Sequence, residues 1–438
     1  MNSNFSEIIK LFTDGVSVVK PSVLIDENVI LENSILSIKQ PDNTVETIDL
    51  SAFENIYVIG AGKASAAMAK QMETVLGNKI SKGIIVTKYG FLEDLEHLKL
   101  LEANHPVPDE NGQKAAEQLV ELCSQAGKDD LVVNLLSGGA SALLPLPVIG
   151  ISLAEKKEVT NQLLKSGATI NEMNVVRRHL SQLKGGGLLD FIRPAKVVSL
   201  IISDVIGDKP DIIGSGITVP TKRDFNECWN IIEKYNFQNT FPRTVITCLQ
   251  NGQNKEKQSE SGVKNIILGN NLKALKKVEH EASALGYETK IVDTALEGEA
   301  KIVGKQIAED AILFANEKAV KGKKYCFLYG GETTVNIKGA GLGGRNQELA
   351  LASAIALDGS KGVTFLSGGT DGNDGPTDAA GAVCNGETIQ IAKEKGLNAE
   401  DYLERNDSYN YFKNIDSLLI TGPTGTNVID IQIVIIEI

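Results

Sequence analysis

The stretch "IYVIGAGKAS", residues 56–65, runs from a short apolar segment into a glycine cluster and then into a helical pattern. An uninterrupted run of Ile and Val is typical of a strand buried on both faces of a parallel sheet. The same unit recurs in "LVVNLLSGGASALL" (131–144), "VVSLIISDVIGD" (197–208), "YCFLYGGETT" (325–334), "VTFLSGGTDG" (363–372) and "LLITGPTGTN" (418–427). This repeated strand and glycine loop, usually followed by a helix, predicts an α/β fold.

The length of the chain predicts two domains, since its 438 residues exceed the roughly 250–300 at which a single core stops growing. The polar segment "NGQNKEKQSESGV" (251–263) interrupts the strand-loop pattern and is the candidate linker. We therefore expect domains at residues 1–255 and 256–438, with a tolerance of tens of residues. A discontinuous domain is compatible with the same pattern.

The composition argues against several classes of partner. A net charge of −12 opposes binding to nucleic acid and to anionic lipid. No apolar run approaches the ~20 residues that a bilayer span requires, and the N-terminus lacks a signal-peptide pattern, so we expect a cytoplasmic protein. The five scattered cysteines and four histidines suggest neither a disulfide framework nor a zinc or histidine metal site.

The glycine loops are candidate ligand sites, because parallel sheets bind ligands beyond the carboxyl ends of their strands. Glycine lets a ligand approach the backbone closely, and N–H groups at a helix start favour an anion. A tight turn also needs glycine, so the recurrence of these loops carries more weight than any one of them. The first two loops supply the candidate binding residues Gly60, Gly62, Ser137, Gly138, Gly139 and Ser141.

The first loop does not match a dinucleotide-binding fingerprint. The third glycine of G-x-G-x-x-G would fall at Ser65, and the next strand ends in Thr87 and Lys88, where a ribose-binding acid is expected. NAD is therefore disfavoured. Lys63 lies at the start of the following helix, where the helix dipole disfavours a cation, so its position suggests an anion beside it; a solvated lysine is the alternative.

Two further segments carry cations next to glycines. Arg345 and Asn346 begin a predicted helix within "GAGLGGRNQELALASAIAL" (339–357), where the guanidinium group could bind a phosphate or carboxylate. In "NEMNVVRRHLSQLKGGGLL" (171–189), Arg177, Ser181 and Lys184 would share one face of a helix. We favour Lys184 and Arg177 as anion-binding residues over a solvated basic face.

Acidic residues follow several of the predicted strands. The loop "LSGGTDGNDGPTDAAGAV" (366–383) contains Asp371, Asp374 and Asp378, which we predict as Mg²⁺ ligands because this hard cation prefers carboxylate oxygens. Turns also favour Asp and Gly, so some of these acids are expected to be local. Cations, glycine loops and acids together are what phosphoryl transfer requires. The remaining candidates at strand ends are Asp204, Asp208, Glu332, Gly369 and Thr370.

These motifs resemble the glycerate 2-kinases, the class whose C-terminal part is called the MOFRL domain. The resemblance spans almost the whole chain, from about residue 5 to the C-terminus, and Ile429 is its one modest departure, at a position that is often polar in the family. The segments that carry it are "VIGAGKAS", "ANHPVPD", "LLSGGASALL", "NVVRRHLSQLKGGGL", "SDVIGD", "GGETTV", "GGRNQELAL", "SGGTDGNDGPTDAAGA" and "GPTGTNV".

The resemblance implies transfer of the ATP γ-phosphate to D-glycerate with Mg²⁺, usually giving 2-phosphoglycerate. It also implies a Rossmann-like N-terminal domain, a smaller α/β C-terminal domain and an active site in the cleft between them. The family's catalytic lysine and arginine match Lys63 and Arg345. For Asp204 or Asp208 we expect a role in orienting or deprotonating the acceptor hydroxyl.

Two other functions stay open at this point. One is an NAD(P)H-dependent hydroxypyruvate reductase, which the missing third glycine and ribose acid argue against. The other is a non-catalytic protein that binds a sugar acid or nucleotide. The sequence does not distinguish the 2-hydroxyl from the 3-hydroxyl as acceptor, giving 2- or 3-phosphoglycerate, and it is compatible with a monomer or a homodimer.

Overall fold

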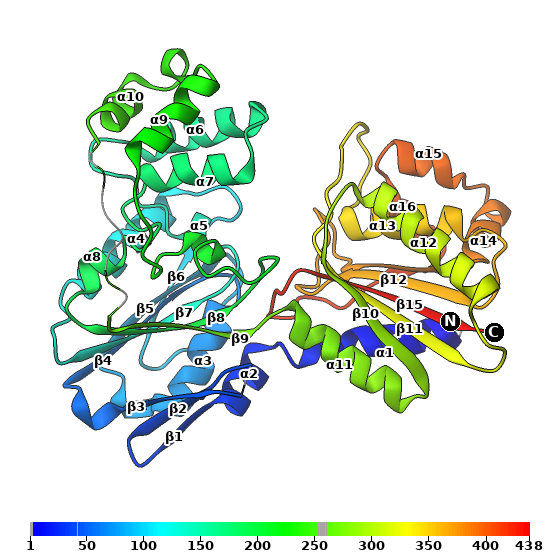
Figure 1. The fold of residues 1–438 in the computed structure, drawn as a ribbon, viewed down its shortest axis with the longest axis horizontal. Helices are drawn as coiled ribbons and strands as arrows, with labels where there is room; N and C mark the ends of the chain where they lie inside the picture. The colour runs from blue at the N-terminus through cyan, green and yellow to red at the C-terminus, as the bar shows by residue number, and fades with distance from the viewer. Residues whose placement is uncertain (1–2, 42, 253, 255–258, 260) are drawn as a thin grey trace. The chain divides into compact units, whose positions relative to one another are not determined.

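The computed structural model describes residues 3–41, 43–252, 254, 259 and 261–438, which form two compact units (Figure 1). The N-terminal unit comprises Leu24–Ser203 and Asp208–Leu268. The C-terminal unit, the smaller of the two, comprises Met1–Val23, Asp204–Gly207 and Gly269–Ile438. The predicted boundary between residues 255 and 256 lies outside the described residues. The predicted α/β class with two domains is confirmed.

The N-terminal unit is built on a sheet whose strands pair in parallel from β6 to β8. The strands are β4 (Asn55–Ala61), β5 (Lys82–Lys88), β6 (Lys99–Ala103), β7 (Asp130–Leu136), β8 (Lys196–Ile202) and β9 (Val263–Gly269). Their order is β6-β5-β4-β7-β8-β9, so the direction of winding reverses between β4 and β7. This is the Rossmann strand order, in which ligands bind at the reversal point.

Helices and a small meander complete the N-terminal unit. Its helices near the sheet are α3 (Ser65–Leu76), α4 (Glu110–Cys123), α5 (Ala140–Leu143) and α8 (Leu189–Ile192). A second group of helices encloses its own apolar core and consists of α6 (Leu153–Lys165), α7 (Ile170–His179), α9 (Phe225–Lys234) and α10 (Arg243–Gln250). The antiparallel meander is β1 (Val29–Glu32), β2 (Ile35–Lys39) and β3 (Val45–Asp49), preceded by α2 (Pro21–Asn28). Short 3₁₀ turns cover Leu50–Ala52, Gly77–Lys79, Ile213–Ser215 and Phe237–Asn239.

The C-terminal unit contains a mixed sheet of order β10-β11-β15-β12-β13-β14. Its strands are β10 (Tyr287–Leu296), β11 (Lys324–Gly331), β12 (Val363–Gly369), β13 (Gly381–Asn385), β14 (Leu418–Leu419) and β15 (Asp430–Glu437). Only the β10–β11 pair is parallel among the pairings described. The sequence predicted that several of these strands would be followed by a glycine loop and usually a helix, as in a parallel sheet. After β12 this prediction is wrong, because no apolar helical pattern follows the glycine loop and the chain returns as the antiparallel strand β13.

Helices cover both faces of the C-terminal sheet (Figure 1). On one face lie α1 (Ser3–Ser17) and α11 (Asn271–Ala284), and on the other lie α12 (Ala300–Glu317) and α13 (Arg345–Ala356). The C-terminal unit also has α14 (Thr388–Glu394), α15 (Ala399–Glu404) and α16 (Ser408–Asn414).

The prediction that the first residues belong to the N-terminal domain is wrong. Helix α1 packs against α11 and β12 through a buried apolar face that includes Ile8, Leu11 and Phe12. Burial of such a stripe is the main source of stability for a short helix, so α1 lies with the sheet that accepts this face. In the described part of the chain, no helix combines the length and apolarity needed to cross a bilayer.

Candidate active site

Two glycine loops of the N-terminal unit meet where the strand order reverses. They follow the adjacent parallel strands β4 and β7. The Lys63 amide donates to the carbonyl of Gly138 at 2.9 Å, and the Ala64 amide donates to Ser137 Oγ at 3.0 Å. The Ser137 amide in turn donates to the carbonyl of Ala61 at 3.1 Å. These three hydrogen bonds hold the two loops together. The Ser137 hydroxyl and the Gly138 carbonyl, which belong to residues predicted to bind a ligand, take part in these contacts between the loops.

The glycines of this region have different roles. Gly62 has φ 139°, and a Cβ there would lie 2.1 Å from Ser137 Oγ. Gly139 has φ 88°, and a Cβ there would lie 3.0 Å from Cδ2 of His105 but at an ordinary contact distance of 3.4 Å from Cγ of Lys63, so this glycine leaves room mainly for the His105 ring beside the lysine. Gly60, predicted as a binding residue, lies inside β4, where a Cβ would meet the Leu135 carbonyl oxygen at 2.6 Å. Strand packing accounts for Gly60.

A cluster of cations and hydroxyl groups adjoins the second loop. The Lys184 ammonium donates to Ser141 Oγ and, at 2.8 Å, to Ser215 Oγ, while Arg177 Nη2 donates to Ser141 Oγ at 3.0 Å. Lys184 is only 4% exposed. Burial, followed by the neighbouring charge of Arg177, lowers the pKa of Lys184 well below its ordinary value.

The predicted helical face through Arg177, Ser181 and Lys184 is wrong, because α7 ends at His179. Lys184 follows in a turn, and this turn brings it to the same serine that Arg177 contacts. Arg177 and Lys184, which we predicted to act together, do lie close to each other. They are linked by hydrogen bonds to Ser141 and do not share one helix.

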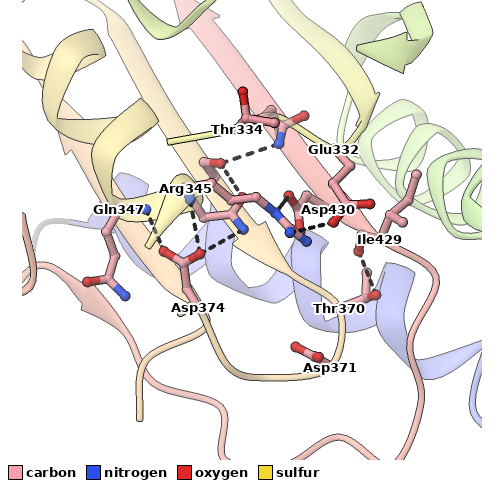
Figure 2. Close-up of polar contacts among 12 residues, drawn as sticks. Glu332, Thr334, Arg345, Gln347, Thr370, Asp371, Asp374, Ile429 and Asp430 are labelled. Atoms are coloured by element: carbon pink, nitrogen blue, oxygen red, sulfur yellow. Dashed lines mark hydrogen bonds and ion pairs between the residues drawn. The ribbon is translucent and has the colours of Figure 1, made fainter. Parts of the chain in front are cut away.

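In the C-terminal unit, Arg345 lies where three strand ends converge (Figure 2). Both β11 and β12 run antiparallel to β15, so both end where β15 begins, and Asp430 is in register with Gly331 and Gly369. Arg345, the first residue of α13, donates through Nε at 2.5 Å and Nη2 at 3.0 Å to the two carboxylate oxygens of Asp430. Its Nη1 donates to Glu332 Oε1 at 2.5 Å.

These carboxylates orient the Arg345 guanidinium group and keep it charged. Burial opposes the charge, but Asp430, followed by Glu332, raises the pKa of Arg345 above its ordinary value. The Asp430 side chain is 1% exposed, whereas that of Arg345 is 33% exposed. The three contacts use three of the five N–H donors of a guanidinium group, which leaves two for an anionic ligand.

Asp374 caps helix α13. Its carboxylate accepts hydrogen bonds from the Asn346 amide at 3.1 Å and the Gln347 amide at 2.8 Å, which satisfies N–H groups of the first helical turn. Burial raises the pKa of Asp374 to about 7, against the opposing effect of the Gln347 and Asn346 amides. The cap explains why this aspartate lies next to the helix that carries Arg345.

The three predicted Mg²⁺ ligands are not assembled as a metal cluster. Asp374 is committed to the helix cap, Asp378 accepts from Tyr409 Oη at 2.7 Å, and Asp371 accepts from the Asn373 amide at 3.1 Å. Across the described residues, no group of three or more His, Cys, Asp or Glu side chains is placed to hold a metal ion. Local turn and cap contacts separate these acids.

Three other predicted binding residues hold the site together. Asn346 Oδ1 accepts from Ser367 Oγ at 2.6 Å in the interior. Gly369 ends β12 opposite Asp430, and Thr370 donates through its amide and Oγ1 to the Ile429 carbonyl at 3.1 and 2.6 Å. These contacts fix the backbone next to Asp430 (Figure 2).

The two candidate bases belong to different units. Asp204 lies in the C-terminal unit, where its Oδ2 accepts from Asn427 Nδ2 at 3.4 Å. Asp208 lies in the N-terminal unit with φ 52°, a left-handed conformation that Asp tolerates in turns. Lys63 and Arg345 are likewise contributed by the N-terminal and the C-terminal unit.

Asp430 and Ser215 are the residues of these sites that the sequence reasoning missed. Asp430 is an isolated acid at the start of the apolar run "IDIQIVII" (429–436), and a lone charge in a predicted buried strand is a usable signal. Ser215 has no comparable signal, because its contact with Lys184 arises from folding alone.

Comparisons with known proteins agree with this architecture. The model of a domain of unknown function, DUF4147, matches residues 7–250, and the MOFRL family model matches residues 325–430. D-glycerate 2-kinase from Thermotoga maritima is 43% identical over 395 residues, covering 90% of this chain and 94% of the relative. A relative from Agrobacterium vitis, named provisionally as a hydroxypyruvate reductase, is 42% identical, covering 86% of this chain and 98% of the relative.

A solved structure extends the similarity to the whole chain. The crystal structure of glycerate kinase from Thermotoga maritima superimposes with a TM-score of 0.86 at 39% identity and covers 100% of both chains. The two family models match separate parts of the chain, and the superposition supports the fold as a whole. The chain belongs to the glycerate 2-kinase family that carries a C-terminal MOFRL domain.

Proposed function

We propose that this protein is an ATP-dependent kinase that transfers the γ-phosphate of ATP to the 2-hydroxyl of D-glycerate, giving 2-phosphoglycerate. The observation that carries this proposal is the position of Lys63 at the reversal point of a Rossmann-type sheet, in a chain of the glycerate 2-kinase family. A lysine held there by a second glycine loop suits an anionic substrate.

In the proposed reaction, the glycerate hydroxyl oxygen attacks the γ-phosphorus, a new O–P bond forms, and the bond to the β–γ bridging oxygen breaks as ADP leaves. Asp204 accepts the hydroxyl proton, with Asp208 as the alternative base. Lys63 and Arg345 stabilise the charge on the transferred phosphoryl group, the electrostatic contribution that dominates such transfers. A cleft between the two units, as the family resemblance implies, is part of this proposal.

Mg²⁺ belongs to the proposal as the partner of ATP. In kinase sites the metal is held largely by phosphate oxygens with one or two carboxylates, so three clustered protein acids are not required. Asp371, half-buried in the loop that follows Thr370, is the carboxylate that we assign to it. The metal would neutralise charge on the phosphates.

A hydroxypyruvate reductase is the second candidate, since one relative carries that name. The first loop argues against it. Ser65 Oγ donates to the carbonyls of Gly62 and Val86 at 2.7 and 3.0 Å, so a side chain fills the position of the third fingerprint glycine. In a dinucleotide-binding fold the third glycine allows the helix to pack closely on the strand, and the Ser65 side chain departs from that pattern.

Activity assays separate the candidates. We expect ADP release that requires D-glycerate, ATP and Mg²⁺, and no oxidation of NADH with hydroxypyruvate. Enolase added alone would consume 2-phosphoglycerate directly, whereas 3-phosphoglycerate would first need a mutase. NADH oxidation without ADP release would refute the kinase, and ligand binding with neither turnover would indicate a binding protein.

Substitutions test the two cations. We expect Lys63→Ala and Arg345→Ala each to lower kcat by roughly 10²–10³-fold, the effect of removing one donor to developing charge, with the fold retained. The exposed Lys79→Ala is the control and should leave kcat unchanged. If both residues act on one phosphoryl group, the double variant should lose less than the product of the two single losses. Wild-type turnover in either single variant would reject its role.

A further inference from the structure

Helix α6 buries a lysine on its apolar face. Leu153, Val159 and Leu163 form the buried stripe of this helix, and Lys156 occupies the position between them. Lys156 is 8% exposed, and its ammonium group has no hydrogen-bond partner among the described residues. Burying a charged group without a partner is strongly unfavourable, so lysines in cores are almost always paired. An anionic ligand, or loss of the proton, would relieve this cost.

The charge of Arg177 adds to the cost of charging Lys156. Helix α6 packs against α7, which carries Arg177 (Figure 1). Burial is the main influence that lowers the pKa of Lys156, to about 7, and the charge of Arg177 adds to it. The charges of Arg177 and Lys156 also lower the pKa of Lys184, in addition to the larger effect of its burial.

Hydroxyl groups stand between these cations. Ser141 accepts from both Arg177 and Lys184, and Ser215 donates to Ser141 at 3.1 Å. Arg177, Lys184 and the two serines thus form a connected network in the N-terminal unit. Helix α6, which carries the unpartnered ammonium of Lys156, packs against α7, which carries Arg177. Such a set offers several N–H and O–H donors to an anion and supplies no competing negative charge.

We propose that Lys156, Arg177, Lys184, Ser141 and Ser215 form a receptor for a phosphate group, in which Lys156 is the third cation. Three cations, of which Lys156 and Lys184 are buried and Arg177 is half-buried, match a multiply charged phosphate or polyphosphate better than a single carboxylate, and arginine adds a bidentate fork for phosphate oxygens. The proposal rests on the proposed kinase function only for the source of that phosphate, which would be ATP or the phosphorylated product.

Tripolyphosphate is the probe, because it carries the charge of ATP without the nucleoside. Its affinity for the full chain would be measured by titration calorimetry, with D-glycerate as the carboxylate ligand. We expect the wild type to bind tripolyphosphate, Lys156→Met to bind it at least tenfold more weakly, and Lys165→Met, an exposed lysine of the same helix, to match the wild type. D-glycerate affinity should be unaffected by Lys156→Met.

Folding of the variant is monitored separately. Methionine continues the apolar stripe of α6, so the melting temperature of ligand-free Lys156→Met should equal or exceed that of the wild type. Should this variant fail to fold, the wild type gives the same test. Tripolyphosphate binding at pH 8, measured in two buffers of different ionisation enthalpy, should then be accompanied by proton uptake as Lys156 and Lys184 become charged.

Three results would overturn the proposal: equal tripolyphosphate affinity in the wild type and Lys156→Met, loss of D-glycerate affinity instead, or no proton uptake. The kinase proposal fails separately. Absence of D-glycerate-dependent ADP release, together with Lys156-dependent tripolyphosphate binding, would refute the kinase and retain the receptor.

Discussion

Replacing Asp430 by asparagine tests the geometry of the arginine site. The substitution keeps the side-chain shape but removes the charge that pairs with Arg345 through two N–H donors. Breaking a buried ion pair by removing one partner costs about 3–5 kcal/mol. Because Arg345 is 33% exposed and keeps its contact with Glu332, we expect the lower value of ~2–3 kcal/mol in the free energy of unfolding.

This loss should appear as a fall in melting temperature of roughly 4–12 °C, given ~2–4 °C per kcal/mol for a domain of 150–250 residues. Calorimetry is the assay, since Trp229, the single tryptophan of the chain, lies in the N-terminal unit and would not report on the C-terminal transition. A misoriented Arg345 should also lower kcat by on the order of 10²-fold, with a smaller change in KM.

Two comparisons make the test decisive. Asp310→Asn, an exposed acid of the same unit, should leave melting temperature and kcat unchanged. The double variant Asp430→Asn, Arg345→Met should lose less stability than the sum of the singles, by about 1–3 kcal/mol, because neither the buried Asp430 charge nor the Arg345 charge is left without the other. A shift below ~1 °C with wild-type turnover, or additive losses, would refute the pairing as the element that orients Arg345.

Three further outcomes are expected. Gly139→Ala should destabilise the protein by about 1–2 kcal/mol through its left-handed φ, and it should also lower kcat by pushing the His105 ring, 3.0 Å away, against the loop that carries Lys63. Gly150→Ala, with φ 89° and nothing within 4 Å, should lose similar stability but keep kcat. Equal kcat in the two variants would contradict a positioning role for Gly139. Asp374→Asn should lower the free energy of unfolding by ~0.5–2 kcal/mol, as expected for the loss of a helix cap. The loss should be the same in the presence of Mg²⁺ and of a chelator. A loss of stability seen only with Mg²⁺ would instead support Asp374 as a metal ligand. The folded-state pKa of Lys156 is lowered from 10.5 to about 7, so the unfolded chain binds more protons between these values and stability should rise from pH 7 to pH 10.5. Urea denaturation at pH 7.5 and 9 should show a smaller rise in Lys156→Met, and an identical rise would disprove the lowered pKa of Lys156.

The sequence by itself determined the elements and part of the site. The apolar runs of β4, β7, β8, β11 and β12 and the glycines after them are local signals, since side-chain branching favours strands and glycine permits sharp turns. Arg345 was expected in the first turn of a helix and begins α13. Such predictions hold because each depends on residues close together in the chain.

Which groups meet was decided only by the tertiary structure. Arg345 pairs with Asp430, 85 positions later, because β11 and β12 flank β15 in one register. Asp374 became a helix cap instead of a metal ligand through the fold of its loop against α13. Lys156 reads as an ordinary lysine in the sequence, and its burial follows from the packing of α6 on α7. Charge pairing acts across space, so sheet register and helix packing select the partners that local sequence leaves open.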